Sequence, residues 1–214
     1  MTQDDVPEVS RVERRCFTNP WPAAAYRREL REPQHNVYLV LRNYPSIAAG
    51  SPSEGAGNGH GTARLPENGR PLPRLPLLAF GRRPEAEERP PIIGFAGMWI
   101  MYDEAHVTTI GVEPDSRGRG LGELLLVALF DEALRRGAGW LTLEVRVSNE
   151  AAQALYRKYE FTIQGTRRRY YSDNNEDAYI MWSPSLRDHA YLERYASLRR
   201  NIADRLGLEF AQAS

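Results

Sequence analysis

The sequence predicts an α/β (α+β) fold. Short β-branched and apolar runs recur along the chain, which is typical of strands, and amphipathic stretches of helical length lie between them. The size fits this class, because 214 residues with 42% hydrophobic and 26% charged side chains can build one domain with a sizeable core. We therefore expect one globular domain in which helices pack on a sheet.

Charge and cysteine content exclude several classes of protein. The chain carries 28 basic and 28 acidic side chains, a balance that argues against a general nucleic-acid binder. Its one cysteine, Cys16, excludes an internal disulfide framework and argues against a cysteine-based zinc site, so no metal site is predicted. No apolar run approaches the ~20 residues that cross a bilayer, and the acidic start is unlike a signal or transit peptide. We expect a cytoplasmic protein without a membrane partner.

The first 43 residues predict two helices and a strand. A helix through Val12 and Phe17, with a buried and inert thiol at Cys16, should end at the Asn-Pro-Trp-Pro run of 19–22. A second helix follows over 23–30, and the apolar run 37–41 predicts a strand.

Residues 44–91 differ from the rest of the chain in composition. They hold nine of the 15 prolines and seven of the 17 glycines. Such a segment buries little apolar surface and cannot easily offset the entropy of ordering it, so we interpret it as a mobile insertion. A short extended piece over 75–80 is expected to be able to dock on the domain.

The remaining chain alternates between strands and helices. Strands are predicted over 92–100, 106–112, 140–147, 161–163 and 178–182, and helices over 121–136 and 149–159. One side of the first helix should be apolar through Leu124, Leu125, Ala128, Leu129 and Ala133. Asn149 should cap the second helix. Residues 167–177 are interpreted as an aromatic and charged loop.

The tail after residue 186 predicts an amphipathic helix. Its apolar residues recur at steps of three and four: Tyr191, Tyr195, Leu198, Ile202 and Leu206. We divide the chain into a domain over 1–186 and a helical extension over 187–214. The apolar stripe is expected to pack on the domain, with a homodimer contact or a partner surface as alternatives.

A glycine-rich turn at 117–122 is the strongest local signal for function. It lies between a predicted strand and a long helix, where Gly118, Gly120 and Gly122 leave the N–H groups of the first helical turn accessible. Such a turn can bind phosphate oxygens, and Arg117 and Arg119 would add positive charge. The spacing excludes a Walker motif and a dinucleotide fingerprint. A plain glycine-rich connection is the alternative.

The turn and the strands around it resemble a known family. The pattern Arg117-x-x-Gly120-x-Gly122, preceded by Ile110-Gly111-Val112-x-Pro114, is similar to the acetyl-CoA pyrophosphate loop of the GNAT superfamily of N-acetyltransferases. Further motifs resemble the RimI family of ribosomal-protein-alanine N-acetyltransferases within it. These are Phe17-x-x-Pro20-Trp21, Leu143-Glu144-Val145-Arg146-x-Ser148-Asn149, and Arg168-x-Tyr170-Tyr171. The resemblance covers residues 4–41 and 92–183.

The resemblance implies a mixed central sheet flanked by helices, with splayed central strands that bind acetyl-CoA. A β-bulge commonly produces such a splay. The family has a strand before residue 4 that is absent here, and Glu160 replaces a glycine, so we expect a positive φ there. The residues implied for acetyl-CoA are Ile110, Gly111, Val112, Arg117, Gly118, Arg119, Gly120, Leu121, Gly122, Glu123 and Asn149. Among them, Gly111 would allow close approach of the cofactor and the Val112 N–H would stabilise the oxyanion.

Two catalytic residues follow from the resemblance. Glu144 is implied as the general base and Tyr156 as the general acid that protonates the leaving thiolate. Taken alone, Glu144 is a solvated carboxylate on the same strand face as Thr142 and Arg146, and Tyr156 is helix packing. His106 and two tryptophans, Trp21 and Trp99, are assigned to packing only.

The acceptor site is predicted at the hairpin loop. Tyr170, Tyr171, Glu176 and Asp177 could frame a peptide N-terminus, because an acidic pair attracts a cationic amine. A solvated loop without function is the alternative. Together these features favour an acetyl-CoA-dependent enzyme that acetylates the N-terminal amine of a protein, above all a ribosomal protein that begins with alanine. The alternatives are transfer to a lysine or a small amine, and a non-catalytic CoA-binding sensor.

Overall fold

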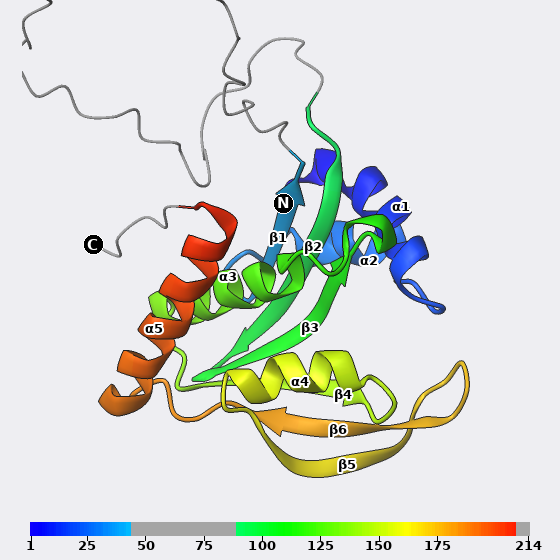
Figure 1. Cartoon of the computed structure of the whole chain (residues 1–214). Coiled ribbons are helices and arrows are strands. Elements are labelled where there is room, and N and C mark those ends of the chain that lie inside the picture. The colour runs from blue at the N-terminus through cyan, green and yellow to red at the C-terminus, as the bar shows by residue number, and fades with distance from the viewer. Residues whose placement is uncertain (44–88, 209–214) are drawn as a thin grey trace, which may run out of the picture.

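A computed structural model describes residues 1–43 and 89–208, which form a sheet with helices on both faces (Figure 1). The strands are β1 (Asn36–Arg42), β2 (Ile92–Met101), β3 (Glu104–Val112), β4 (Trp140–Arg146), β5 (Thr162–Tyr171) and β6 (Glu176–Trp182). The helices are α1 (Val6–Cys16), α2 (Ala23–Glu29), α3 (Leu121–Arg135), α4 (Glu150–Lys158) and α5 (His189–Leu206). The predictions for 44–88 lie outside the described residues.

The sheet is mixed, as the resemblance implied. Its strand order is β1-β2-β3-β4-β6-β5, and every neighbouring pair is antiparallel except β3 and β4, which are parallel. The predicted α/β fold with a mixed central sheet is therefore confirmed. Before α1 the chain forms a short 3₁₀ turn over Gln3–Asp5 rather than the strand of the family.

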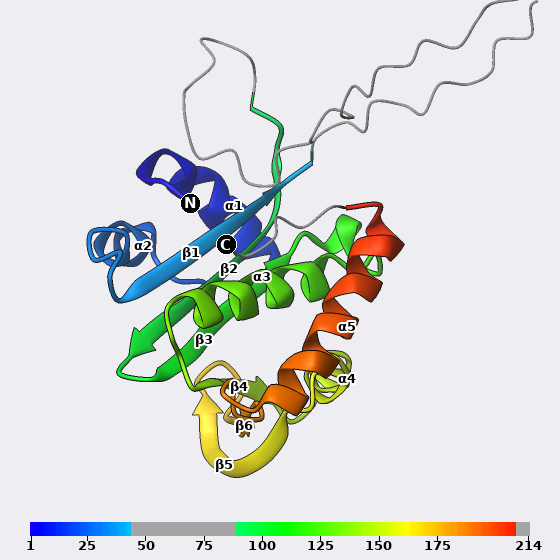
Figure 2. The ribbon, with the colours of Figure 1, turned by 90° about the vertical axis from the view of Figure 1, so that its left-hand side faces the viewer.

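Two hydrophobic cores lie on opposite faces of the sheet. Figure 2 shows the helices that cover them, α3 and α5 on one side and α1 and α2 on the other. Strand residues alternate between the two sides, so Val37 packs with α3 and α5 while its neighbour Tyr38 packs with α1 and α2. On β4 the odd residues Leu141, Leu143 and Val145 enter the larger core. Thr142 and Glu144 consequently lie on the opposite face.

Helix α3 is buried on more than the one side that the sequence predicted. Leu126, Val127 and Phe130 are fully buried, whereas Leu124 and Ala128 are only half-buried. The reason is α5, which crosses α3 on the side away from the sheet: the ring of Tyr195 stacks on Phe130 with centroids 4.9 Å apart. The Tyr195 hydroxyl donates to the Val127 carbonyl at 3.2 Å.

The apolar stripe of the C-terminal tail thus packs on this chain's own domain. Tyr191, Tyr195 and Ile202 are buried, and Leu198 and Leu206 pack against the same core. The surface offered as an alternative dimer contact is covered by α3. The division of the chain after residue 186 stays a prediction. None of the helices within 1–43 and 89–208 is long and apolar enough to cross a membrane.

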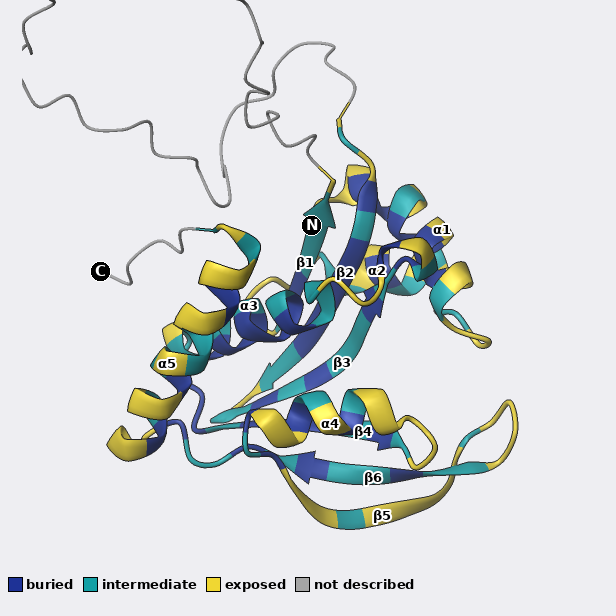
Figure 3. Ribbon diagram, viewed as in Figure 1, coloured by how far each residue is buried: buried dark blue, intermediate teal, exposed yellow. Residues whose placement is uncertain are grey.

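The predicted loop at 167–177 is wrong. Strand β5 continues to Tyr171 and β6 begins at Glu176, so only 172–175 turn. Strand β5 lies at the edge of the sheet, and both of its faces are largely exposed (Figure 3). Its sequence therefore lacks the apolar alternation from which a half-buried strand is predicted.

Glu160 adopts the backbone conformation that its position after α4 requires. Its φ is +62°, in the left-handed region that favours glycine. Both of its carboxylate oxygens accept from Arg194 of α5, at 2.7 and 2.8 Å. The expected positive φ is confirmed, and the ion pair links this strained residue to the C-terminal helix.

Candidate active site

Strands β3 and β4 diverge halfway along their length (Figure 1). Their parallel pairing runs from Glu104 opposite Trp140 to Val107 opposite Leu143 and stops there. The register between β2 and β3 shifts at the same level, where Thr108 is an extra residue between Val107 and Thr109. This bulge twists β3 away from β4, which is the splay that the resemblance implied.

Beyond the bulge, the edge of β3 away from β2 pairs with no strand among residues 1–43 and 89–208. The Glu113 N–H donates to the Ile93 carbonyl of β2 at 2.8 Å. Because backbone groups alternate in an antiparallel pair, the N–H of Gly111 also faces β2, while those of Ile110 and Val112 face the opening. The Val112 carbonyl faces the same way and accepts from Cys16 Sγ at 3.3 Å and Arg117 Nε at 3.1 Å.

The predicted cofactor residue Gly111 has a packing role. A Cβ on Gly111 would lie 2.6 Å from the ring of Phe95, so this glycine makes room for a core side chain rather than for a ligand. Cys16 is only half-buried, and burial raises the pKa of its thiol, which keeps the thiol protonated. The burial expected for Cys16 is therefore only partial, and its inertness stays a prediction.

The glycine-rich turn has the geometry of an anion site. Gly118 and Gly120 have φ of +75° and +81°, and Gly120 is the residue before α3. A Cβ on Gly118 would meet nothing within 4 Å, so the loop is open there. The N–H groups of Leu121 and Gly122, together with that of the next residue, have no intrahelical acceptor. This cradle fits the pyrophosphate that the resemblance implies.

The side chains around the turn divide into exposed and engaged ones. Arg117 and Arg119 are exposed beside the loop. Glu123, in contrast, is buried and accepts from Lys158 at 2.5 Å, Arg205 at 2.5 Å and the Tyr159 hydroxyl at 2.8 Å. Burial alone would raise the pKa of Glu123, but these donors outweigh it and hold the pKa below its ordinary value. Only the backbone N–H of Glu123 is therefore available to a phosphate.

Glu144 lies where β3 and β4 part. Its side chain is 6% exposed, and each oxygen has one nitrogen neighbour: Arg167 Nε at 2.9 Å and His106 Nε2 at 3.0 Å. Arg167 reaches it from β5 across β6. Burial alone would raise the pKa of Glu144, but His106 and Arg167 outweigh it and hold the pKa below its ordinary value. The carboxylate is thus ionised at neutral pH.

A hollow of about 480 Å³ opens over Glu144 on the sheet face that α1 and α2 leave uncovered. His106, Thr142 and Arg167 line it with Glu144. The sequence assigned only packing to His106 and no role to Arg167. His106 lies opposite Thr142 in the parallel register. That register is a long-range pairing which no local pattern reveals, and Arg167 was placed in a loop.

Tyr156 lies on α4 and belongs to the larger core, on the sheet face opposite the hollow over Glu144. Its ring is buried next to Phe161, with centroids 5.7 Å apart. Burial raises the pKa of its phenol, and the neighbouring Tyr171 adds to the effect, so the hydroxyl stays protonated and can donate. Asn149 caps α4 as predicted, since its side chain accepts from the Ala152 N–H at 3.1 Å.

The predicted acceptor residues separate into two pairs. Tyr170 and Tyr171 lie near Glu144, whose charge contributes to a raised pKa of both phenols after burial. Glu176 instead accepts from the Ser148 N–H at 2.8 Å and from Arg146 at 3.1 Å. The Ser148 bonds lower its pKa to about 2. Asp177 accepts from the Arg169 N–H at 2.8 Å. These two carboxylates stabilise the hairpin, and their hydrogen bonds leave them less available to bind an amine.

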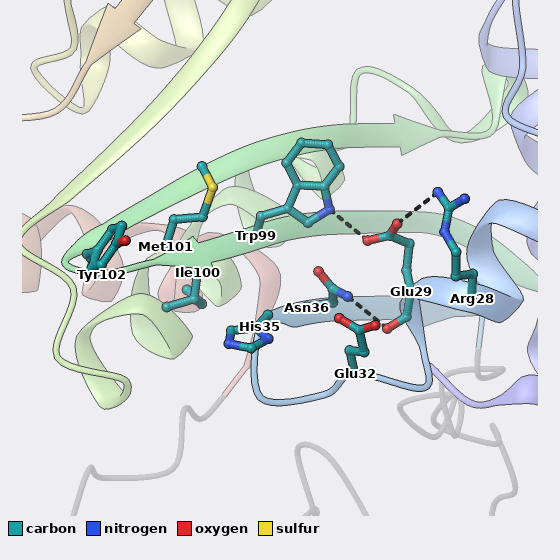
Figure 4. Close-up of a pocket in the computed structure, with 9 residues that line it drawn as sticks. All are labelled: Arg28, Glu29, Glu32, His35, Asn36, Trp99, Ile100, Met101 and Tyr102. Carbon is teal, nitrogen blue, oxygen red and sulfur yellow. Dashed lines mark hydrogen bonds and ion pairs between the residues drawn. The ribbon is translucent and has the colours of Figure 1, made fainter.

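A larger hollow of about 610 Å³ lies on the same side of the sheet (Figure 4). Its carboxylate Glu29 accepts from Trp99 Nε1 at 2.9 Å and pairs with Arg28 at 3.4 Å. The ring of Trp99 also stacks on His106, with centroids 6.1 Å apart. Glu32 and His35 also line this hollow, but it lies away from the point where β3 and β4 part, which is where the hollow over Glu144 opens.

Comparison with known proteins agrees with this geometry. The model of the acetyltransferase (GNAT) family matches residues 66–161. N-alpha-acetyltransferase RimI of Mycobacterium tuberculosis is 37% identical over 183 residues, which cover 85% of this chain and 87% of that protein. A Bacillus subtilis protein, provisionally assigned as an alanine N-acetyltransferase of ribosomal protein bS18, is 31% identical over 85% of this chain and 91% of its own length.

Solved structures show the same fold. The ribosomal-protein-S18-alanine N-acetyltransferase of Escherichia coli superposes with a TM-score of 0.58 at 28% identity and covers 86% of this chain and 90% of that chain. Ard1 of Thermoplasma volcanium, at 22% identity and a TM-score of 0.57, shares the fold. The chain therefore belongs to the GNAT family and, within it, to the RimI-type N-alpha-acetyltransferases, enzymes that take their acetyl group from acetyl-CoA.

Proposed function

We propose that this enzyme acetylates the N-terminal amine of a ribosomal protein that begins with alanine, bS18 being the leading candidate. The acceptors of the Escherichia coli and Bacillus subtilis relatives support this choice. A ribosomal acceptor supports a reaction in the cytoplasm. The observation that carries the proposal is the carboxylate of Glu144 at the point where β3 and β4 part, open to a hollow on one face.

In the proposed mechanism each group has one task. Acetyl-CoA, when bound, supplies the activated acetyl thioester. The N–H groups of Ile110 and Val112 line the open edge of β3, and the Val112 N–H is placed to stabilise the carbonyl oxygen. Glu144 draws the proton from the α-ammonium group. The amine nitrogen bonds to the acetyl carbon as the carbon–sulfur bond breaks, and Tyr156 donates its proton to the sulfur. The second proton that the nitrogen loses as the amide forms returns to the Tyr156 oxygen and restores the phenol.

The lowered pKa of Glu144 favours an α-amine over a lysine. An α-amine has a pKa near ~7.8 and a lysine near ~10.4, so deprotonating lysine costs about 3.5 kcal/mol more. A carboxylate that is a weak base suits the easier proton. Tyr170 and Tyr171, which lie near this carboxylate, would flank the first residues of the peptide.

The test compares two peptides of one sequence. A peptide that begins with alanine should be acetylated with a kcat/KM at least 100-fold above that of the same peptide with a blocked N-terminus and an internal lysine. Mass spectrometry locates the acetyl group. If the blocked peptide is the better substrate, the lysine or small-amine alternative replaces this proposal. If neither reacts while acetyl-CoA binds, the CoA-binding sensor is favoured.

A further inference from the structure

A chain of four polar side chains crosses the paired part of β3 and β4. Thr142 Oγ1 lies 2.6 Å from Glu104 Oε1 and 2.8 Å from His106 Nδ1. On the other side of the imidazole ring, Nε2 lies 3.0 Å from Glu144 Oε2. All four residues line the hollow over Glu144.

The first two links fix the tautomer of His106. A carboxylate has no hydrogen to donate, so the single hydroxyl hydrogen of Thr142 points to Glu104. The Thr142 oxygen can then only accept from His106, and Nδ1 must carry a hydrogen. In a neutral imidazole the other nitrogen, Nε2, is consequently bare.

The bare nitrogen faces a second acceptor. With Nε2 unprotonated, its lone pair opposes the Glu144 carboxylate at 3.0 Å, and no hydrogen bond joins them. One added proton between the two atoms turns this contact into a charge-assisted hydrogen bond. The geometry therefore contains a place for one proton, shared by His106 and Glu144.

We propose that the proton removed from the acceptor amine is held between His106 Nε2 and Glu144 Oε2, so that His106 is a positioning residue of the base. The inference rests on the proposed function. The form that accepts the proton is neutral His106 beside ionised Glu144. The ammonium group loses one proton to this pair, and the pair returns it to water through the hollow, so no further reactant is needed.

The surroundings of the ring allow this role. Glu104 Oε1 lies 3.8 Å from Nδ1. Arg167 pairs with the far oxygen of Glu144 and opposes an added proton there. Trp99 of β2 stacks on the ring and holds its plane. The side chain of His106 is 18% exposed, which leaves a path for the proton to solvent.

The direct test is nitrogen NMR of the full chain labelled in its histidines, without substrates. At high pH the His106 ring should be the Nδ1–H tautomer, and on acidification the new proton should appear on Nε2. His189, whose side chain is 88% exposed and which has no threonine hydroxyl bonded to its ring, serves as the internal control and should not respond to a change at Thr142. Thr142→Val, which removes the hydroxyl, should abolish the bias at His106.

Kinetics supply the second readout. His106→Gln keeps a hydrogen-bond donor towards Glu144 but cannot take up a proton. We expect kcat for the alanine peptide to fall about 10- to 100-fold and its acidic limb to move to lower pH by about one unit or more. KM for both substrates should change less than about twofold. The matched control, His189→Gln, should behave as the wild type.

Two results would overturn the inference. One is an Nε2–H tautomer of neutral His106. The other is a His106→Gln variant that loses rate with an unchanged pH profile, which indicates a merely structural role. Both are separate from the proposed function, because the NMR arm needs no acceptor and the wild type can acetylate the alanine peptide in either case.

Discussion

The two halves of β3 use their backbone in opposite ways. From Glu104 to Val107 the strand is paired on both sides, with β2 and with β4. From Thr109 to Val112 it is paired with β2 and, within the part of the chain that the structure describes, with no second strand. The paired half presents side chains that hold protons, above all His106. The open half presents N–H groups to a space that a ligand can enter.

One extra residue separates these halves. Thr108 is the bulge that turns β3 away from β4, directly after the last paired position, Val107. Unpaired backbone groups are unfavourable unless a partner or water satisfies them, so an open edge inside a sheet is a site that a bound molecule completes. We therefore expect cofactor binding and acid–base chemistry to occupy adjacent stretches of one strand.

The largest effect is expected at the junction of the halves. Glu144→Gln keeps the shape of the side chain and removes the base, so kcat should fall about 10²- to 10⁴-fold while acetyl-CoA still binds. Glu150→Gln, an exposed carboxylate at the start of α4, is the matched control. A wild-type rate for the Glu144 variant would reduce this residue to a structural ion pair.

A smaller loss of kcat is expected when the hydroxyl of Tyr156 is removed. Tyr156→Phe removes only a hydroxyl, and the ring keeps its contact with Phe161. If the phenol protonates the leaving sulfur, kcat should fall about 10²-fold with unchanged acetyl-CoA affinity measured by calorimetry. Tyr102→Phe, at a fully exposed position, controls for the loss of a hydroxyl. Equal rates for both variants would make Tyr156 a packing residue.

A substitution in the glycine-rich turn should weaken the binding of acetyl-CoA without a further effect on catalysis. Gly118→Leu places a side chain in the open space of the loop, and we expect the Kd for acetyl-CoA to rise about tenfold, or ~1.4 kcal/mol. Gly137→Leu is a close match, because Gly137 has a φ of +77° against +75° and equally open surroundings at the other end of α3. If both variants weaken binding equally, backbone strain explains the result.

The smallest effect concerns stability in acid. The pKa of Glu144 is lowered in the folded protein, so its contribution to stability is complete above the ordinary value of 4.5. That contribution is lost as the pH falls below 4.5 towards the folded-state pKa. Urea unfolding of Glu144→Gln should therefore depend less on pH than the wild type in this range. If the free energy of unfolding depends on pH equally in the wild type and the variant, the ion pairs of Glu144 do not lower its pKa.

Much of the fold follows from local patterns. The apolar runs of β1 to β4, the cap at Asn149 and the glycines before α3 each act through neighbours in the sequence. Most of strand β5 was not predicted, because its exposed faces show no alternation of apolar and polar residues. The burial of a second side of α3 was not predicted, because α5, which covers it, comes from a distant part of the chain.

The site was predictable only in part, for the same physical reason. Glu144 and Tyr156 carry recognisable motifs. His106 and Arg167 become visible only when β3, β4 and β5 are assembled, because their roles depend on strand pairing. Glu176 and Asp177 were expected to attract an amine. Their carboxylates are engaged by Ser148, Arg146 and Arg169, which composition cannot reveal.

The contrast between the halves of β3 is tested most directly by amide hydrogen exchange of this strand. Without acetyl-CoA, the Gly111 amide should exchange slowly, since it faces β2, and the amides of Ile110 and Val112 should exchange fast. Adding acetyl-CoA should slow Ile110 and Val112 at least tenfold and leave Gly111 unchanged. If Ile110 and Val112 are already protected, or stay fast when acetyl-CoA is bound, the open edge of β3 is not its binding site.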